Sequence, residues 1–141
     1  MEGAVSMLGV TKKKKIKQNA FRILVAEDDP QGLKLLEMIL QKMKFEDIVS
    51  VADGLSAWQE FEKTNKPFDL VIADWDMPFA TGMELLDQIR EEGYNTPFLM
   101  VTGRGLMDSA IEAKLSGASG FIAKPFSPQH MMDKIKTILP L

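Results

Sequence analysis

Four short polar segments each follow a run of apolar residues, and together they carry acids, a hydroxyl and an ammonium. The segments are Glu27-Asp28-Asp29, Asp74-Trp75-Asp76, Thr102-Gly103 and Lys124-Pro125. The apolar runs before them are typical of parallel strands that are covered on both faces. Because the carboxyl ends of parallel strands meet at one edge of a sheet, where ligands bind, we expect the four segments to share a site.

Three carboxylates at this edge, those of Glu27, Asp28 and Asp74, would repel one another. Two carboxylates about 4 Å apart repel by roughly 4 kcal/mol at an effective dielectric constant of about 20. They remain ionised together only if a cation shares the site. Oxygen ligands favour a hard ion such as Mg²⁺, with Mn²⁺ as the alternative. The chain has no cysteine and a single histidine, which disfavours a nitrogen or sulfur site.

The same residues could also transfer a phosphoryl group. A carboxylate beside Mg²⁺ is a nucleophile toward phosphorus and forms an aspartyl phosphate. The transferred group spreads negative charge over three oxygens, which need partners already in place. Mg²⁺ can take one oxygen, Lys124 another, and Thr102 with nearby backbone N–H groups the third. The residues therefore predict phosphoryl transfer to Asp74.

Five apolar runs alternate with amphipathic stretches from Phe21 onward, which indicates an α/β fold with a parallel sheet. The predicted strands are Arg22–Ala26, Asp47–Val51, Leu70–Ala73, Phe98–Val101 and Gly120–Ala123. The predicted helices begin after Asp29, after Asp53, at Met83 (ending near Glu92), at Leu106 (ending near Ser116) and after Ser127.

Three expectations concern burial and packing. In the second helix, Leu55, Trp58 and Phe61 fall on one face and are expected to be buried. The fourth helix is the least apolar, so it is expected to pack most loosely. Trp75 is expected to be a partly exposed residue at the rim of the site.

Composition limits the class of protein. The chain has 141 residues, of which 45% are hydrophobic and 26% charged, as in a soluble globular domain. Residues 1–20 hold five lysines and one acid, while the whole chain has a net charge of −3. We expect a flexible basic leader over 1–20 and one α/β domain over 21–141. No apolar run approaches the ~20 residues that cross a bilayer. We therefore expect a cytoplasmic protein without membrane association or direct DNA binding.

The polar segments and the strands before them form a set of motifs in a fixed order. The motifs are ILVAEDDP (23–30), DLVIADWDMP (69–78), TG (81–82), PFLMVTG (97–103) and GFIAKPF (120–126). They resemble the receiver domain of bacterial response regulators, the CheY-like family, and the resemblance covers residues 21 to 141. It implies a doubly wound, five-stranded parallel sheet of the flavodoxin/CheY-like (βα)5 type with strand order 2-1-3-4-5.

The resemblance assigns roles to the acids. Asp74 is the phosphoacceptor. Glu27 and Asp28 are the acidic pair, with Asp28 the more direct Mg²⁺ ligand and Glu27 acting largely through water. Asp76 would offer its backbone carbonyl to the metal.

The resemblance also implies a switch. Thr102 and Lys124 are the switch hydroxyl and the phosphate-binding lysine, and Lys124-Pro125 is a step that often has a cis peptide bond. Phe121 stands where the family places a switch aromatic, often a tyrosine. Phe121 has no hydroxyl, so a switch here cannot depend on a hydrogen bond from a tyrosine hydroxyl.

The implied mechanism needs partners. A histidine kinase or phosphotransfer protein donates the phosphoryl group, and the receiver catalyses only its own phosphorylation and dephosphorylation. Added charge of about −1.5 to −2 would draw Thr102 inward, and Phe121 would follow. The surface of the fourth helix, fifth strand and fifth helix would then bind a different downstream protein.

One hypothesis concerns the lifetime of the phosphoryl group. We expect the side chains of Asp76 and Arg104 to pair over the mouth of the site and to tune hydrolysis. Unchanged hydrolysis rates in Asp76→Asn and Arg104→Ala, alone and combined, would contradict this idea.

Two other readings stay open. Asp74-Trp75-Asp76 matches the DxD motif of haloacid-dehalogenase-type phosphatases. That family expects Thr or Val where this chain has Pro78, and it carries the motif on its first strand. The second reading is a receiver-like scaffold that binds partners without being phosphorylated. With no output domain in the sequence, we expect a stand-alone receiver; the alternative is a fragment of a longer protein.

Overall fold

Strands and helices alternate along the chain in a computed structural model that describes residues 17–63, 65–103 and 106–141. After a short 3₁₀ turn, Gln18–Ala20, the strands form one parallel sheet in the order β2-β1-β3-β4-β5. This confirms the predicted fold class and strand order. The strands are β1 Arg22–Ala26, β2 Asp47–Val51, β3 Leu70–Asp74, β4 Phe98–Thr102 and β5 Gly120–Ala123. The helices are α1 Pro30–Lys42, α2 Gly54–Lys63, α3 Gly82–Glu91, α4 Leu106–Leu115 and α5 Pro128–Ile138.

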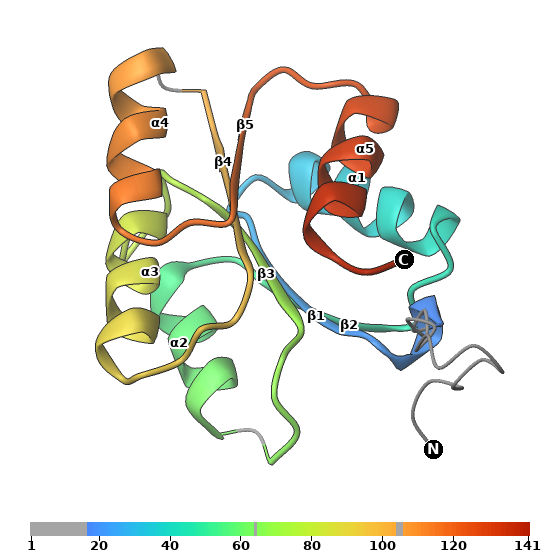
Figure 1. The fold of residues 1–141 in the computed structure, drawn as a ribbon, viewed down its shortest axis with the longest axis horizontal. Helices are drawn as coiled ribbons and strands as arrows, with labels where there is room; N and C mark the ends of the chain where they lie inside the picture. Colours follow the sequence, from blue (N-terminus) through green and yellow to red (C-terminus); the bar gives the residue numbers. More distant parts are fainter. Residues whose placement is uncertain (1–16, 64, 104–105) are drawn as a thin grey trace, which may run out of the picture.

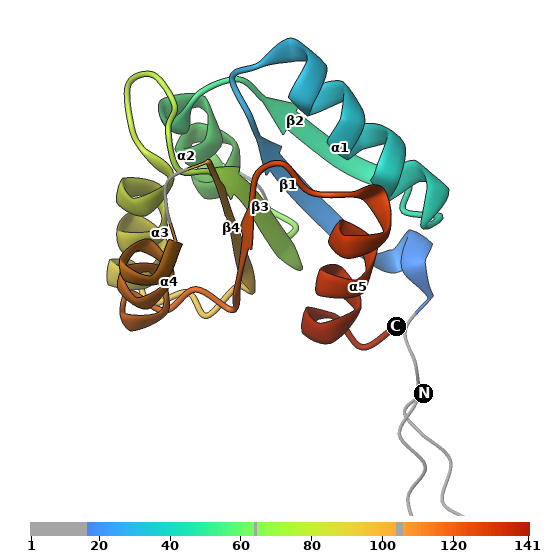
Figure 2. The same ribbon diagram turned by 90° about the horizontal axis from the view of Figure 1, so that it is seen from above.

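Helices cover both faces of the sheet, so the domain has three layers. Helices α1 and α5 lie on one face and α2, α3 and α4 on the other (Figure 1, Figure 2). Each face has its own apolar cluster: Leu40, Leu99 and Ile135 are buried on the first, and Phe61 and Phe98 on the second. The apolar central strands predicted from the sequence are therefore explained by coverage on both sides.

The strand register brings the polar segments together. Ala26 pairs with Ala73, so Glu27 follows β1 beside the point where β3 reaches Asp74. On the other side of β3, Thr102 ends β4 and pairs with Ala123 of β5. All four predicted segments therefore lie at one edge of the sheet.

Capping residues begin the helices where the sequence predicted. The Asp29 side chain accepts a hydrogen bond from the Gly32 N–H at the start of α1, and Pro30 is the first helical residue. Asp53 accepts the Ser56 N–H at the start of α2. Ser127 caps α5 in the same way.

At α3 the cap is reciprocal. The Thr81 hydroxyl accepts a hydrogen bond from the Glu84 backbone N–H, and the Glu84 carboxylate accepts one from the Thr81 backbone N–H. The helix therefore starts one residue earlier than predicted, at Gly82, and its direction is fixed directly after the loop that leaves β3.

Several predicted ends differ by one residue. β3 and β4 each extend one residue further than expected, to Asp74 and Thr102, because Asp74 still pairs with Val101 and Thr102 with Ala123. α3 ends at Glu91 and α4 at Leu115, each one residue short of the prediction.

Two burial predictions are wrong. Leu55 is 49% exposed, and the buried residues of α2 are Gly54, Ala57 and Phe61. The reason is that Gly54 packs directly on the loop between β3 and α3: a Cβ there would lie 2.1 Å from the Ala80 carbonyl oxygen.

Trp75 is 5% exposed and packs in the apolar cluster on the α2–α3 face, contrary to the rim position expected from the sequence. The backbone N–H of Trp75 donates to the Val101 carbonyl oxygen at 2.8 Å, so the chain continues alongside β4 after β3 ends.

The fourth helix is loosely packed, as predicted. Among the side chains described in α4, Ala113 is the buried one, while Met107, Ile111 and Leu115 are exposed. Of the predicted leader, residues 1–16 lie outside the described residues. Within the described ranges, no helix is long and apolar enough to cross a membrane.

Candidate functional site

An acidic cluster occupies the carboxyl edge of the sheet. Glu27 and Asp28 follow β1, and Asp74 ends β3; each offers a carboxylate oxygen that lies within 4.8 Å of the other two. Glu27 is 1% exposed and Asp74 7% exposed, whereas Asp28 is open to solvent. Three of the acids named from the sequence are thus brought together, two of them buried.

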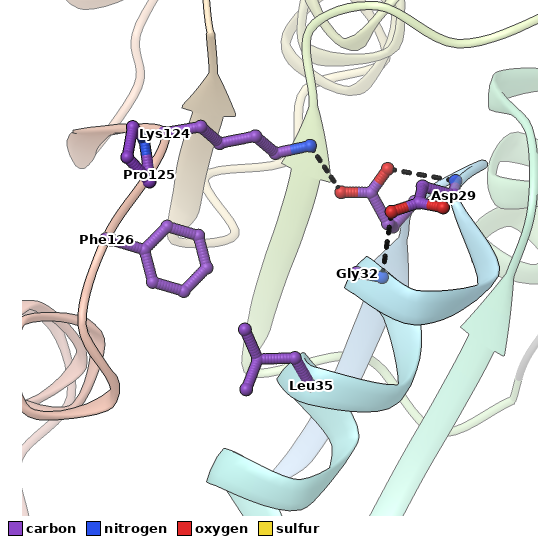
Figure 3. Close-up of a pocket in the computed structure, with 7 residues that line it drawn as sticks. Asp29, Gly32, Leu35, Lys124, Pro125 and Phe126 are labelled. Atoms are coloured by element: carbon purple, nitrogen blue, oxygen red, sulfur yellow. Dashed lines mark hydrogen bonds and ion pairs between the residues drawn. The ribbon is translucent and has the colours of Figure 1, made fainter.

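Lys124 supplies a positive charge to this cluster. Its Nζ lies 2.6 Å from Oε1 of Glu27 and 2.5 Å from Oδ2 of Asp74. Figure 3 shows the Lys124 side chain reaching from the segment after β5 toward the start of α1. The Lys124–Pro125 peptide bond is cis, as the family resemblance suggested. One ammonium therefore joins two carboxylates from different strands.

Backbone N–H groups orient the same two carboxylates. The Asp29 N–H donates to Oε2 of Glu27 at 3.1 Å, and the Asp76 N–H donates to Oδ1 of Asp74 at 3.1 Å. In each buried carboxylate, therefore, one oxygen accepts a hydrogen bond from the Lys124 ammonium and the other accepts one from a backbone N–H. Hydrogen bonds of this kind satisfy groups that would otherwise be costly to bury.

The electrostatics follow from burial and these contacts. Burial raises the pKa of Glu27 above its ordinary value, although the hydrogen bonds from Lys124 and the Asp29 N–H act to lower it. Burial acts to lower the pKa of Lys124, but its hydrogen bonds to Asp74 and Glu27 outweigh burial, and the pKa is raised. Lys124 is therefore a protonated donor at neutral pH.

The donor set suits a hard cation. Glu27, Asp28 and Asp74 offer oxygen ligands only, and a cluster of three carboxylates beside one ammonium keeps an excess of negative charge. Mg²⁺ is bound in proteins by a few carboxylates together with waters and phosphate oxygens. The cluster could therefore hold Mg²⁺.

The structure describes three of the remaining predicted residues, Thr102, Phe121 and Asp76. Thr102 is fully buried, and its carbonyl oxygen accepts the Lys124 N–H at 2.8 Å. Phe121 is half-buried on β5 and packs against the apolar cluster of the α2–α3 face. The side chain of Asp76 is exposed. Arg104 lies outside the described residues, so its pairing with Asp76 stays a prediction.

Sequence reasoning missed the positioning role of Gly82. A Cβ on Gly82 would lie 2.4 Å from the carbonyl oxygen of Asp74 and 2.9 Å from Sδ of Met100. The absence of a side chain lets the start of α3 pack directly on the end of β3. The signal was present, since Thr81-Gly82 stood out as a motif without an assigned role.

A pocket beside the cluster was also missed. A cavity of about 410 Å³ opens between α1 and the segment after β5. Figure 3 shows Leu35 and Phe126 on its two sides, with Lys124 at one end. The apolar Pro125-Phe126 pair directly after Lys124 was the available signal.

Comparisons with known proteins identify the family of this chain. The model of the response regulator receiver domain family matches residues 23–136. Chemotaxis protein CheY of Pseudomonas aeruginosa is 33% identical over 119 residues, which cover 83% of this chain and 94% of that protein. A CheY homolog of Campylobacter jejuni is 31% identical over 120 residues, covering 84% and 92%.

Solved structures give the same result. Chemotaxis protein CheY4 of Vibrio cholerae superposes with a TM-score of 0.76 at 29% identity, covering 84% of this chain and 98% of that one. The receiver domain of the Francisella response regulator 1452 has a TM-score of 0.76 at 26% identity, covering 82% and 93%. The fold, the matched residues and these relatives lead to one conclusion: the chain belongs to the response regulator receiver domain family and is of the CheY type.

Proposed function

We propose that this receiver acts in a two-component phosphorelay, accepting a phosphoryl group on Asp74 from a histidine kinase or phosphotransfer protein. The observation that carries the proposal is the position of the Asp74 carboxylate between the acid pair and the Lys124 ammonium. A carboxylate flanked by an ammonium and by ligands for a hard cation is suited to nucleophilic attack on phosphorus.

Phosphoryl transfer to Asp74 forms one bond and breaks one. A carboxylate oxygen of Asp74 forms a bond to phosphorus as the bond from phosphorus to the donor's imidazole nitrogen breaks, and the imidazole keeps that electron pair. The Lys124 ammonium has three N–H donors, two of which donate hydrogen bonds to Glu27 and Asp74. The third can bind a phosphoryl oxygen, and the Thr102 hydroxyl can bind another.

Glu27, Asp28 and Asp74 would hold Mg²⁺, together with the carbonyl oxygen of Asp76. The ion would supply positive charge that offsets the charge of the phosphoryl oxygens. Mn²⁺ has the same preference for oxygen ligands and would substitute.

The proposed output is a change of surface. Thr102 lies buried next to β5, and drawing its hydroxyl toward the phosphoryl group would free space for Phe121, which is half-buried. The surface formed by α4, β5 and α5 would then bind a downstream protein. The exposed apolar side chains of α4 support this, because large exposed apolar patches mark interaction sites.

We infer that the protein catalyses only its own phosphorylation and dephosphorylation and is not an enzyme for other substrates. We also infer that it acts in the cytoplasm. A haloacid-dehalogenase-type phosphatase would need its aspartate pair on the first strand, whereas Asp74 ends β3 here. A scaffold that is never phosphorylated would have no need for Lys124 to contact two buried carboxylates.

Binding of beryllofluoride, a tetrahedral mimic of a carboxylate-bound phosphoryl group, tests the proposal. In ¹⁹F NMR we expect a bound signal for the wild-type chain that requires Mg²⁺ and is absent in Asp74→Asn. A bound signal of equal intensity in the variant, or none in the wild-type chain, would contradict Asp74 as the acceptor.

A further inference from the structure

One residue near the phosphoacceptor combines an unfavourable backbone conformation with an exposed aromatic side chain. Phe79, in the loop from β3 to α3, has a φ of 70° and is 84% exposed. Residues with a Cβ avoid this region, and bulky ones most of all. Lys44 also has a positive φ, of 73°, but it directly follows the end of α1, where this conformation commonly terminates a helix. No helix end accounts for Phe79.

Neighbouring segments fix the shape of this loop without the help of the Phe79 side chain. The Gly82 N–H donates to the Trp75 carbonyl oxygen at 2.8 Å, which closes the loop at its base. The Gly54 N–H, at the start of α2, donates to the Pro78 carbonyl oxygen at 3.3 Å. Glycine or asparagine would adopt the same backbone with less strain. The fold therefore gives no reason for an aromatic residue here.

The position of the loop suggests a reason outside the domain. Phe79 lies five residues after Asp74, in the loop that leaves the same strand end. Asp74 is 7% exposed, so a phosphohistidine can react with it only by coming close to this edge of the sheet. Reacting atoms must approach to about 3–3.5 Å. The protein that carries the histidine therefore has to cover the loops around Asp74.

The surface beside Phe79 is also apolar. Its neighbour Ala80 lines an open groove of about 150 Å³ between α2 and α3, together with Leu55 and Trp58. Leu55 is 49% exposed. Exposed aromatic residues next to apolar surface carry a large share of the binding energy at protein interfaces.

Building on the proposed function, we propose that Phe79 is a specificity residue for the phosphodonor protein. Its ring inserts into an apolar hollow on the donor beside the phosphorylated histidine, and the strained loop holds it in position before the donor arrives. Phe79 does not touch the phosphoryl group. It acts on the docking of a protein donor and not on the reaction with a small one.

Two phosphodonors separate these roles. The small donor is acetyl phosphate with Mg²⁺. To find the protein donor, every histidine kinase of the source organism is autophosphorylated with ATP and tested on the wild-type chain. The kinase that phosphorylates the wild-type chain fastest is then used as the protein donor. The variants are Phe79→Asn and Phe79→Tyr. The control is Tyr94→Asn, because Tyr94 is an aromatic residue that is 46% exposed and lies before β4, at the opposite edge of the sheet from Asp74.

For Phe79→Asn we expect the kcat/KM of transfer from the kinase to fall about tenfold or more, chiefly through KM. The rate with acetyl phosphate stays that of the wild-type chain, and the unfolding temperature does not fall, because asparagine tolerates a positive φ. Phe79→Tyr retains most of the transfer from the kinase, and Tyr94→Asn all of it.

Equal kinase transfer to Phe79→Asn and the wild-type chain would overturn the inference, as would an equal loss with both donors. So would a set of kinases of which none phosphorylates a chain that acetyl phosphate does phosphorylate. If acetyl phosphate fails to phosphorylate the wild-type chain, the proposed function itself fails and the inference with it.

Discussion

The Nζ atom of Lys124 lies 2.5 Å from Oδ2 of Asp74, a residue 50 positions earlier in the chain. The same ammonium lies 2.6 Å from Oε1 of Glu27. Residues at the carboxyl ends of three strands, β1, β3 and β5, therefore meet through this one ammonium. This contact offsets the repulsion between two buried carboxylates, and it puts a donor where a phosphoryl group on Asp74 would need one.

Replacing this lysine is expected to slow phosphorylation without unfolding the domain. Lys124→Met removes a positioned donor, and loss of such a donor costs about 100-fold or more in rate. Lys124→Arg does not restore the rate, because a planar guanidinium cannot occupy the position of a compact ammonium. The rate of mass gain with acetyl phosphate measures the effect, with Lys136→Met on the exposed face of α5 as the control. A Lys124→Met variant as fast as this control would contradict the role of Lys124.

Magnesium is expected to stabilise the folded chain. A ligand that binds only the folded state adds about 2.7 kcal/mol at a concentration 100-fold above its dissociation constant. Asp28→Asn should lose most of this gain, whereas Glu62→Gln, an exposed acid on α2, should keep it. Thermal unfolding with MgCl₂ and with NaCl of equal ionic strength measures both. An equal gain in Asp28→Asn and the wild-type chain would argue against a metal site at this cluster.

Gly82→Ala is expected to destabilise the domain. The new Cβ would lie 2.4 Å from the Asp74 carbonyl oxygen, and relief requires movement of backbone. Overpacking of this kind costs roughly 1–3 kcal/mol. Gly103→Ala is the matched control, because its Cβ would meet nothing within 4 Å and should change stability by no more than about 0.5 kcal/mol. Urea unfolding of the two variants should separate them, and equal midpoints would refute the close packing at Gly82.

Arg90 is expected to hold the turn between α4 and β5. Its guanidinium donates to the Gly117 carbonyl oxygen at 2.8 and 3.2 Å and to that of Tyr94 at 3.0 Å. Arg90→Ala should cost about 1–2 kcal/mol, since hydrogen bonds from a charged group are among the stronger ones. Arg90→Lys should recover little, because lysine cannot donate in this fork. Urea unfolding checks both, with Glu91→Ala, an exposed neighbour on α3, as the control. Full recovery in Arg90→Lys would contradict this account.

The sequence predicted the fold well because its signals are local. The apolar runs, the caps at Asp29, Asp53 and Ser127, and the polar residues after each strand depend on few neighbours. Convergence of Glu27 and Asp74 followed from parallel topology alone, since carboxyl ends of parallel strands share an edge.

Tertiary packing decided the features that the sequence did not reveal. Trp75 was expected at the rim but is buried, because its segment continues to bond β4 after the strand ends. Leu55 was expected inside but is exposed, because close backbone contact at Gly54 sets which face of α2 turns inward. The positive φ of Phe79 has no signal in the residue type, since a phenylalanine disfavours it; Phe79 is the middle residue of a tight turn in which the Ala80 N–H donates to the Pro78 carbonyl oxygen at 2.8 Å.

The mass of the intact chain after reaction with acetyl phosphate tests the central claim most directly. Wild-type chain and Asp74→Asn are compared, each with Mg²⁺ and with EDTA. We predict that the wild-type chain gains the mass of one phosphoryl group with Mg²⁺ only, and that Asp74→Asn gains none. Equal gain in Asp74→Asn, or gain that persists in EDTA, would contradict a magnesium-dependent phosphoacceptor at Asp74.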